Sequence, residues 1–111
     1  MPLPEFILNL PAIELPVPED VVTTNAVRSD AGLVVFFSIH KDLELPAHSH
    51  EAQWGTVLEG ALELTIGDDT RIYHPGESYS IPSGVVHSAR ARAGTRVVDV
   101  FEEADRYPLK S

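Results

Sequence analysis

The sequence predicts an all-β fold in a single domain, and three observations support this. Nine short stretches rich in apolar and β-branched residues are separated by turn-forming sequences. Within several of them apolar and polar residues alternate, as in a strand with one buried face. No apolar stripe with the 3.6-residue period of a helix runs for helical length. This pattern alone does not separate a sandwich from a closed barrel.

The expected strands begin after the first twenty residues and follow one another closely. They cover residues 21–28, 33–40, 44–48, 53–58, 61–66, 70–74, 77–81, 86–92 and 96–102. The alternation is clearest in residues 61–66 (ALELTI), and residues 67–69 (GDD) suit a hairpin because Gly and Asp tolerate a positive φ. Residues 102–111 are expected to form a turn or a tail.

Residues 1–20 carry five prolines among apolar residues. Proline at this density excludes helix and central strand, while the apolar content is too high for a solvated tail. We therefore expect an extended N-terminal arm (residues 1–20) that lies along a barrel (residues 21–111). The arm lies along either its own barrel or that of a partner, and in the second case exchange of arms between two copies predicts a homodimer.

Composition excludes several classes of partner. The chain has 8 basic and 17 acidic residues, a formal charge of −9, which argues against binding to nucleic acid or to an anionic membrane. It contains no cysteine, so disulfides and thiolate metal sites are excluded. The N-terminus lacks the basic stretch of a signal peptide and no apolar run approaches a membrane span, so we expect a cytoplasmic protein.

Two histidines two residues apart are the first sign of a site. Side chains at positions 48 and 50 of a strand project to the same side, so His48 and His50 can meet one ion. The alternative is two exposed histidines on a polar loop. His40 and His74, at a strand end and before a turn, are expected at the surface.

Two longer motifs indicate a family. Residues 76–87 (GESYSIPSGVVH) match G-x5-P-x-G-x2-H, the second motif of the cupins. Residues 48–60 resemble the first cupin motif, which is H-x-H followed by an acidic residue and, seven positions later, a glycine. Gln53 takes the place of the acidic residue, one position closer to His50 than usual, and Gly60 keeps the spacing. The resemblance implies a double-stranded β-helix, also called a jelly-roll or cupin barrel.

The resemblance also implies one divalent transition metal ion, held by His48, His50, Gln53 and His87. Glu51 is the alternative fourth ligand, but it has the opposite strand parity to the histidines. Imidazole and amide donors suit Zn, Ni, Mn, Fe or Cu better than Ca or Mg. Four protein ligands would close a structural site, whereas a larger coordination shell would keep open positions.

The lumen beyond the metal is expected to hold a small-molecule ligand. The second cupin motif often ends in asparagine, and Ala91 stands there in this chain. Ala91 shares the parity of His87 and Ala89, so small residues should line this part of the lumen. No general base is evident, and Tyr79 is a candidate catalytic residue only if its strand parity turns it into the lumen.

Three functions are compatible with these motifs. The run Gln-x-Gly-x-Val-Leu-x-Gly over residues 53–60 is similar to that of the pectin-degradation cupins, which help to convert unsaturated uronates to linear ketouronates. This resemblance implies an enzyme that uses Lewis-acid chemistry on an oxygenated, sugar-acid-like substrate. The alternatives are an Fe- or Mn-dependent dioxygenase and a non-catalytic binding module with a structural metal.

Overall fold

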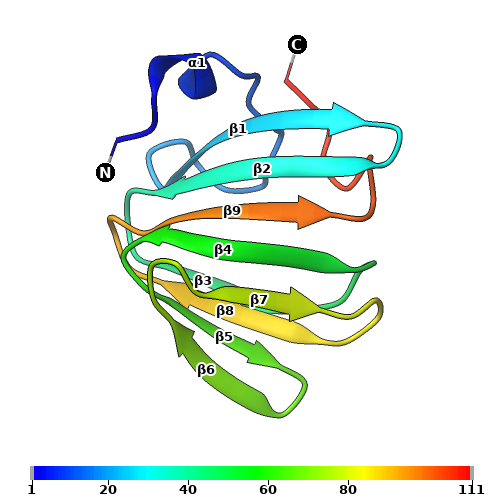
Figure 1. Ribbon diagram of the computed structural model, residues 1–111. Coiled ribbons are helices and arrows are strands. Elements are labelled where there is room, and N and C mark those ends of the chain that lie inside the picture. The colour runs from blue at the N-terminus through cyan, green and yellow to red at the C-terminus, as the bar shows by residue number, and fades with distance from the viewer. Residues whose placement is uncertain (1, 111) are drawn as a thin grey trace.

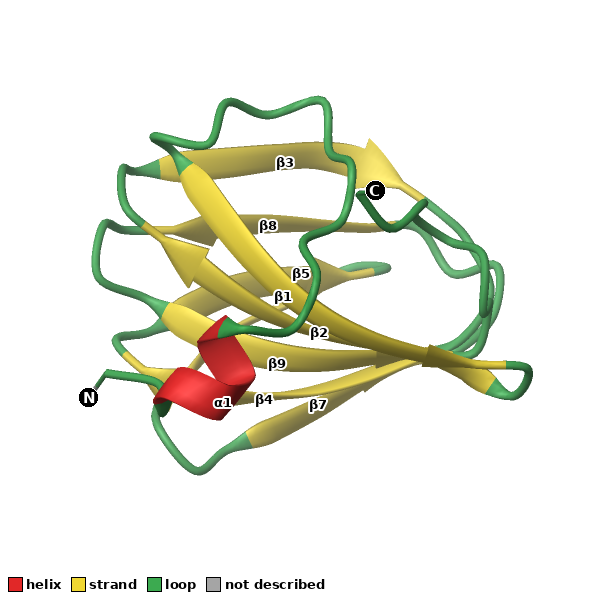
Figure 2. Ribbon diagram, turned by 90° about the horizontal axis from the view of Figure 1, so that it is seen from above, coloured by secondary structure: helices red, strands yellow, loops and turns green. Residues whose placement is uncertain are grey.

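The computed structural model describes residues 2–110 and arranges nine strands in two antiparallel sheets (Figure 1). The larger sheet has the order β1-β2-β9-β4-β7 and the smaller one β3-β8-β5-β6. The strands are β1 (Val22–Ser29), β2 (Gly32–Ile39), β3 (Leu43–His48), β4 (Gln53–Glu59), β5 (Leu62–Ile66), β6 (Asp69–Tyr73), β7 (Ser78–Ile81), β8 (His87–Ala91) and β9 (Arg96–Phe101). Figure 2 separates the sheets: β3 and β8 lie on one side and β9, β4 and β7 on the other.

All nine expected strands are confirmed, and each boundary lies within one residue of the expected position. From β2 onward the chain passes repeatedly between the sheets, as the double-stranded β-helix requires. The prediction of an all-β double-stranded β-helix is therefore confirmed.

The alternating apolar residues of both sheets meet in the barrel interior. One buried cluster joins residues from β4, β5, β7 and β9, namely Val57, Leu62, Leu64, Tyr79, Ile81 and Val97. A second cluster consists of Ile13, Ala26, Leu33, Val35 and Phe101. This second cluster ties the N-terminal segment to the larger sheet.

The N-terminal segment is not extended throughout. It contains a single helical turn, α1 (Glu5–Leu8), although the prolines were expected to exclude helix. Pro4 precedes the turn as its N-cap, and its carbonyl accepts hydrogen bonds from the N–H groups of Ile7 and Leu8. A proline at this end costs little because the first N–H groups of a helix have no intrahelical acceptor. In residues 2–110 no helix is long and apolar enough to cross a membrane.

Residues 10–14 lie along the outer edge of β1 in the same chain (Figure 1). The Ala26 N–H donates to the Pro11 carbonyl at 2.8 Å, and the Ile13 N–H donates to Thr24 Oγ1 at 3.0 Å. The C-terminal segment joins on the other side, where Ile13 forms a β-bridge with Leu109. The two terminal segments thus cover an edge that would otherwise be free to pair with another strand.

We predict that deletion of residues 1–16 destabilises the barrel. The deletion removes Ile13, which is 2% exposed, and uncovers the edge of β1. Ile13→Ala alone should lower the free energy of unfolding by about 2–5 kcal/mol in a urea titration.

If two copies exchange their arms, light scattering should find a dimer for the full chain and a monomer for the deletion variant. Equal masses would refute arm exchange.

Candidate metal centre

Three histidines from both cupin motifs come together inside one end of the barrel. Nitrogen atoms of His48, His50 and His87 all lie within 4.8 Å of one another. His48 ends β3 and stands opposite His87 in the β3–β8 ladder, whereas His50 lies beyond the end of β3. Strand alternation alone therefore does not position the H-x-H pair, since the second histidine is on a loop.

Each of the three rings is oriented by its Nδ1 atom. The Nδ1 atoms of His48, His50 and His87 lie 2.8, 2.7 and 2.9 Å from the backbone carbonyls of Pro46, Glu51 and Val85. A carbonyl only accepts hydrogen bonds, so each neutral ring carries its proton on Nδ1. The lone pairs on Nε2 are then left for another partner.

These Nε2 atoms face one another. Those of His50 and His87 are 3.1 Å apart, and the ring centroids of His48 and His87 are 4.3 Å apart. With both protons on Nδ1, two Nε2 lone pairs at this distance repel each other unless a cation lies close to both. The donor set therefore fits a divalent transition metal ion, for which neutral imidazole is a common ligand.

The pKa shifts of two of the rings agree with metal binding. Burial lowers the pKa of both His50 and His87 from the usual histidine value. The rings thus favour the neutral form, which is the form that binds metals.

The turn of the second motif holds the loop of the first. Gly84 adopts a φ of +80°, which side-chain-bearing residues rarely adopt, and its N–H donates to the His50 carbonyl at 2.8 Å. One residue further on, the Val85 carbonyl binds the Nδ1 atom of His87. The P-x-G-x2-H sequence therefore positions a histidine from each motif.

The two candidates for the fourth ligand lie in different places. Gln53, the first residue of β4, lines the same cavity as the histidines, and its side chain hydrogen-bonds to Asp99. Glu51 is exposed and does not line the cavity. This geometry favours Gln53 over Glu51, and ligation by Gln53 stays a prediction.

A buried carboxylic acid beside the histidines was not expected from the sequence. Asp99, on β9, is 6% exposed and accepts a hydrogen bond from the Tyr79 hydroxyl at 2.6 Å. Burial raises the pKa of Asp99 to about 6, although the hydrogen bonds from Tyr79 and Gln53 oppose this shift. Burial, followed by the nearby Asp99 charge, raises the pKa of the Tyr79 hydroxyl. Tyr79 therefore does face the lumen, as a hydrogen-bond donor to Asp99.

The sequence pattern around Asp99 could have indicated that this residue belongs to a site. It interrupts the apolar run of residues 97–101 (VVDVF) at an inward-facing position between Val97 and Phe101. A carboxylate on the buried face of a strand is costly unless it is bonded, so it often marks a site. Gly55 of the neighbouring β4 supplies the room, because a Cβ there would overlap Asp99 Oδ1 and the Tyr79 hydroxyl.

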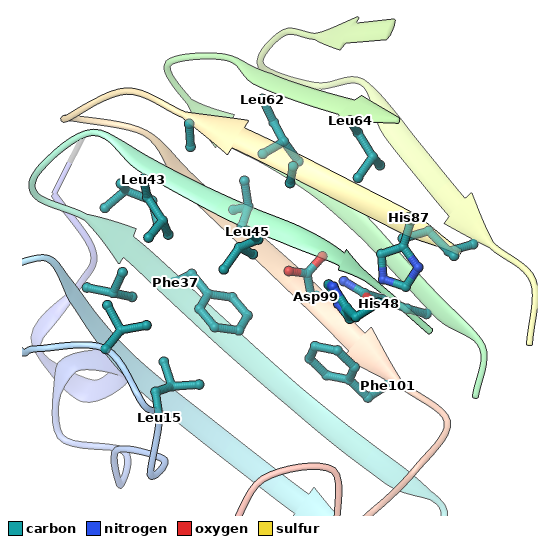
Figure 3. A pocket seen from close by; sticks show the side chains of 18 of the residues that line it. Leu15, Phe37, Leu43, Leu45, His48, Leu62, Leu64, His87, Asp99 and Phe101 are labelled. Atoms are coloured by element: carbon teal, nitrogen blue, oxygen red, sulfur yellow. The ribbon is translucent and has the colours of Figure 1, made fainter. Parts of the chain in front are cut away.

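A cavity of about 450 Å³ extends from this polar group into the barrel (Figure 3). The three histidines, Gln53, Tyr79 and Asp99 all contribute to its wall. Ala89 and Ala91 also line it, so the expectation of small residues in the lumen is confirmed.

Arg106, in the C-terminal segment, adds a cation to the cavity wall. Its Nε atom is buried without a hydrogen-bond partner among the described residues, and its guanidinium lies 4.8 Å from the centre of the Tyr107 ring. The sequence alone did not single out this residue, because nothing in residues 102–111 indicated that the chain returns to the barrel.

The two remaining histidines are exposed, as expected. His40 Nε2 lies 2.7 Å from Thr23 Oγ1, and His74 Nδ1 lies 3.2 Å from Glu77 Oε1. Neither belongs to the histidine cluster.

We predict that Gly55→Ala destabilises the protein by about 1–3 kcal/mol, because the added methyl group must displace Asp99 or Tyr79. The free energy of unfolding in urea measures this effect. Ser80→Ala, an exposed change on the adjacent β7, is the control and should alter stability by less than about 0.5 kcal/mol. Equal stability of the two variants would show that the Asp99–Tyr79 pair does not occupy this space.

Comparisons with known proteins agree with the fold. The family model described as a cupin domain matches residues 35–101, more than half of the chain. No curated protein matches the chain.

Several solved structures are similar at low sequence identity. KdgF from Halomonas sp. is 21% identical, with a TM-score of 0.70 over 89% of this chain and 87% of that chain. An RmlC-like cupin from Shewanella frigidimarina is 21% identical, with a TM-score of 0.73 over 86% of each chain. A variant of oxalate decarboxylase from Bacillus subtilis is 20% identical, with a TM-score of 0.72 over 89% of this chain and 29% of that chain. These structures share the fold, and with the family match and both histidine motifs they show that the chain belongs to the cupin domain family.

Proposed function

We propose that this chain is a metal-dependent enzyme that applies Lewis-acid chemistry to a small oxygenated substrate. One observation carries the proposal: nitrogen atoms of three imidazoles lie within 4.8 Å of one another at the end of a cavity of about 450 Å³. A purely structural metal has no need of a cavity of ligand size beside it.

His48, His50, His87 and Gln53 would hold the ion. When bound, a divalent ion such as Zn, Ni, Mn, Fe or Cu supplies a Lewis acid that polarises a carbonyl or hydroxyl oxygen. The amide of Gln53 leaves the ion's charge undiminished, whereas a carboxylate ligand would partly neutralise it.

Asp99 is the residue placed to exchange a proton with the substrate. Its carboxyl group lines the cavity, and Tyr79 and Gln53 hold it in position by hydrogen bonds. A carboxyl group held in this way can accept a proton from a substrate carbon or hydroxyl group without first rearranging.

Arg106 is placed to bind an acidic group on the substrate. Its buried Nε atom has no hydrogen-bond partner among residues 2–110, which is an unfavourable state that a substrate carboxylate would relieve. Together these groups support a substrate with a carbonyl or hydroxyl oxygen beside a carboxylate. The sugar acids that the resemblance to the pectin-degradation cupins implies carry such a head group, and so do other hydroxy and keto acids.

We predict that the protein purified without chelator carries a divalent transition metal in near-stoichiometric amount. His48→Ala and His87→Ala should each lower metal affinity by at least about tenfold, since each removes one ligand. His40→Ala is the matched control and should not change it, because His40 lies outside the cluster. Elemental analysis of the four proteins makes the comparison, and equal metal content in all four would overturn the assignment.

The identity of the ion distinguishes this function from its alternatives. Turnover with zinc or nickel fits Lewis-acid chemistry, whereas a requirement for iron or manganese together with dioxygen would identify a dioxygenase. A metal whose removal unfolds the barrel, and which binds no added oxygen ligand, would reduce the chain to a binding module.

A further inference from the structure

The cavity continues well beyond the three imidazoles, and its far part is walled by hydrocarbon. We infer that the substrate carries an apolar body, aliphatic or aromatic, attached to its oxygen-bearing head group. The inference rests on the proposed function, because the head group must be held at the imidazole end of the cavity.

The apolar wall is built from three strands and the N-terminal segment. It includes Leu15, Phe37, Leu43, Leu45, Leu62 and Leu64. Figure 3 shows Leu15, Leu43 and Phe37 on the side of the cavity away from His48 and His87. A ligand bound at the imidazoles and filling the cavity must therefore lie against these side chains.

Polar side chains in the wall are concentrated at the other end. His48, His50, His87, Gln53, Tyr79, Asp99, Arg106 and Tyr107 form that polar end. Thr95, the residue immediately before β9, also lines the cavity, and its hydroxyl already donates to the Ala61 carbonyl at 3.2 Å. The far part of the cavity thus offers no unused side-chain partner to a substrate hydroxyl group among the described residues.

This distribution separates two kinds of oxygenated substrate. A hydroxyl group that leaves water without finding a partner lowers affinity by about tenfold or more. A methylene group buried in the same place raises affinity by about fourfold. A uronate bears hydroxyl groups around its ring, so it suits the imidazole end alone, whereas a hydroxy or keto acid with an alkyl or aryl body matches both ends.

The cavity also has the size for such a molecule. Its volume of about 450 Å³ lies within the range of roughly 300–1,000 Å³ that is usual for small-molecule sites. Ala89 and Ala91 create part of this space on β8, where larger side chains would fill it.

A series of alkyl hydroxamates tests the inference directly. A hydroxamate binds a metal through two oxygens, so acetohydroxamate probes the metal end alone, and butano- and hexanohydroxamate extend the same head group. We expect calorimetric titration of the metal-loaded full chain to give a dissociation constant that falls about fourfold for each added methylene. Galacturonate should bind more weakly than hexanohydroxamate.

Two variants locate the effect. Leu45, on the cavity wall, is 39% exposed, so Leu45→Gln leaves the buried core intact. It should weaken hexanohydroxamate binding by about tenfold while acetohydroxamate binding stays within about twofold. Ile72→Gln, at a 57% exposed position on β6 outside the cavity, is the matched control and should change neither value.

The outcomes separate this inference from the proposed function. Binding of acetohydroxamate with no gain along the series would refute the apolar body and leave the Lewis-acid site standing. A gain along the series that Leu45→Gln does not reduce would also refute it, because the chain would then lie elsewhere. Failure of every hydroxamate to bind a protein of confirmed metal content would overturn the proposed function, and the inference with it.

Discussion

Everything at the candidate site depends on three hydrogen bonds from imidazole Nδ1 atoms to backbone carbonyls. These bonds fix which nitrogen of each ring carries the proton, and they leave the three Nε2 lone pairs free within one cluster. One carbonyl belongs to β3 and the other two to separate loops, and the Gly84 N–H joins those loops by binding the His50 carbonyl. A ring that lost its carbonyl could change tautomer or rotate, and the shared binding point would be lost. The spacing of both histidine motifs therefore places the backbone carbonyls that orient the rings as well as the histidines themselves.

The barrel makes this arrangement possible because the polar side chains that line its cavity are concentrated at one end. The histidines and the Asp99–Tyr79 pair share that end with Gln53, and the absence of a side chain at Gly55 gives the pair its space. Leucines of β3 and β5 wall the rest of the cavity. A site with this polarity can orient a ligand that has a polar head and an apolar body, since reversing the ligand would place both parts in unfavourable surroundings.

Most of the fold could be predicted from the sequence, because strands with one buried face and Gly- or Pro-containing turns leave a clear local pattern. The cluster of His48, His50 and His87 could be anticipated because the two cupin motifs place its members. Asp99, Gly55 and Arg106 were missed for a different reason. Their proximity arises from pairing between β4, β7 and β9 and from the return of the C-terminal segment, and these contacts join residues far apart in the chain. The helical turn α1 was missed because a proline that ends one helix can equally well begin another.

The account's central claim is that the three Nε2 atoms share one metal ion. Anomalous diffraction from crystals of the protein, measured at the absorption edge of the metal found in solution, tests this claim most directly. We expect one dominant anomalous peak about 2.0–2.2 Å from the Nε2 atoms of His48, His50 and His87, as for imidazole ligands of zinc and similar ions. A dominant peak elsewhere, for instance between the exposed His74 and Glu77, or no peak in crystals with bound metal, would contradict the account.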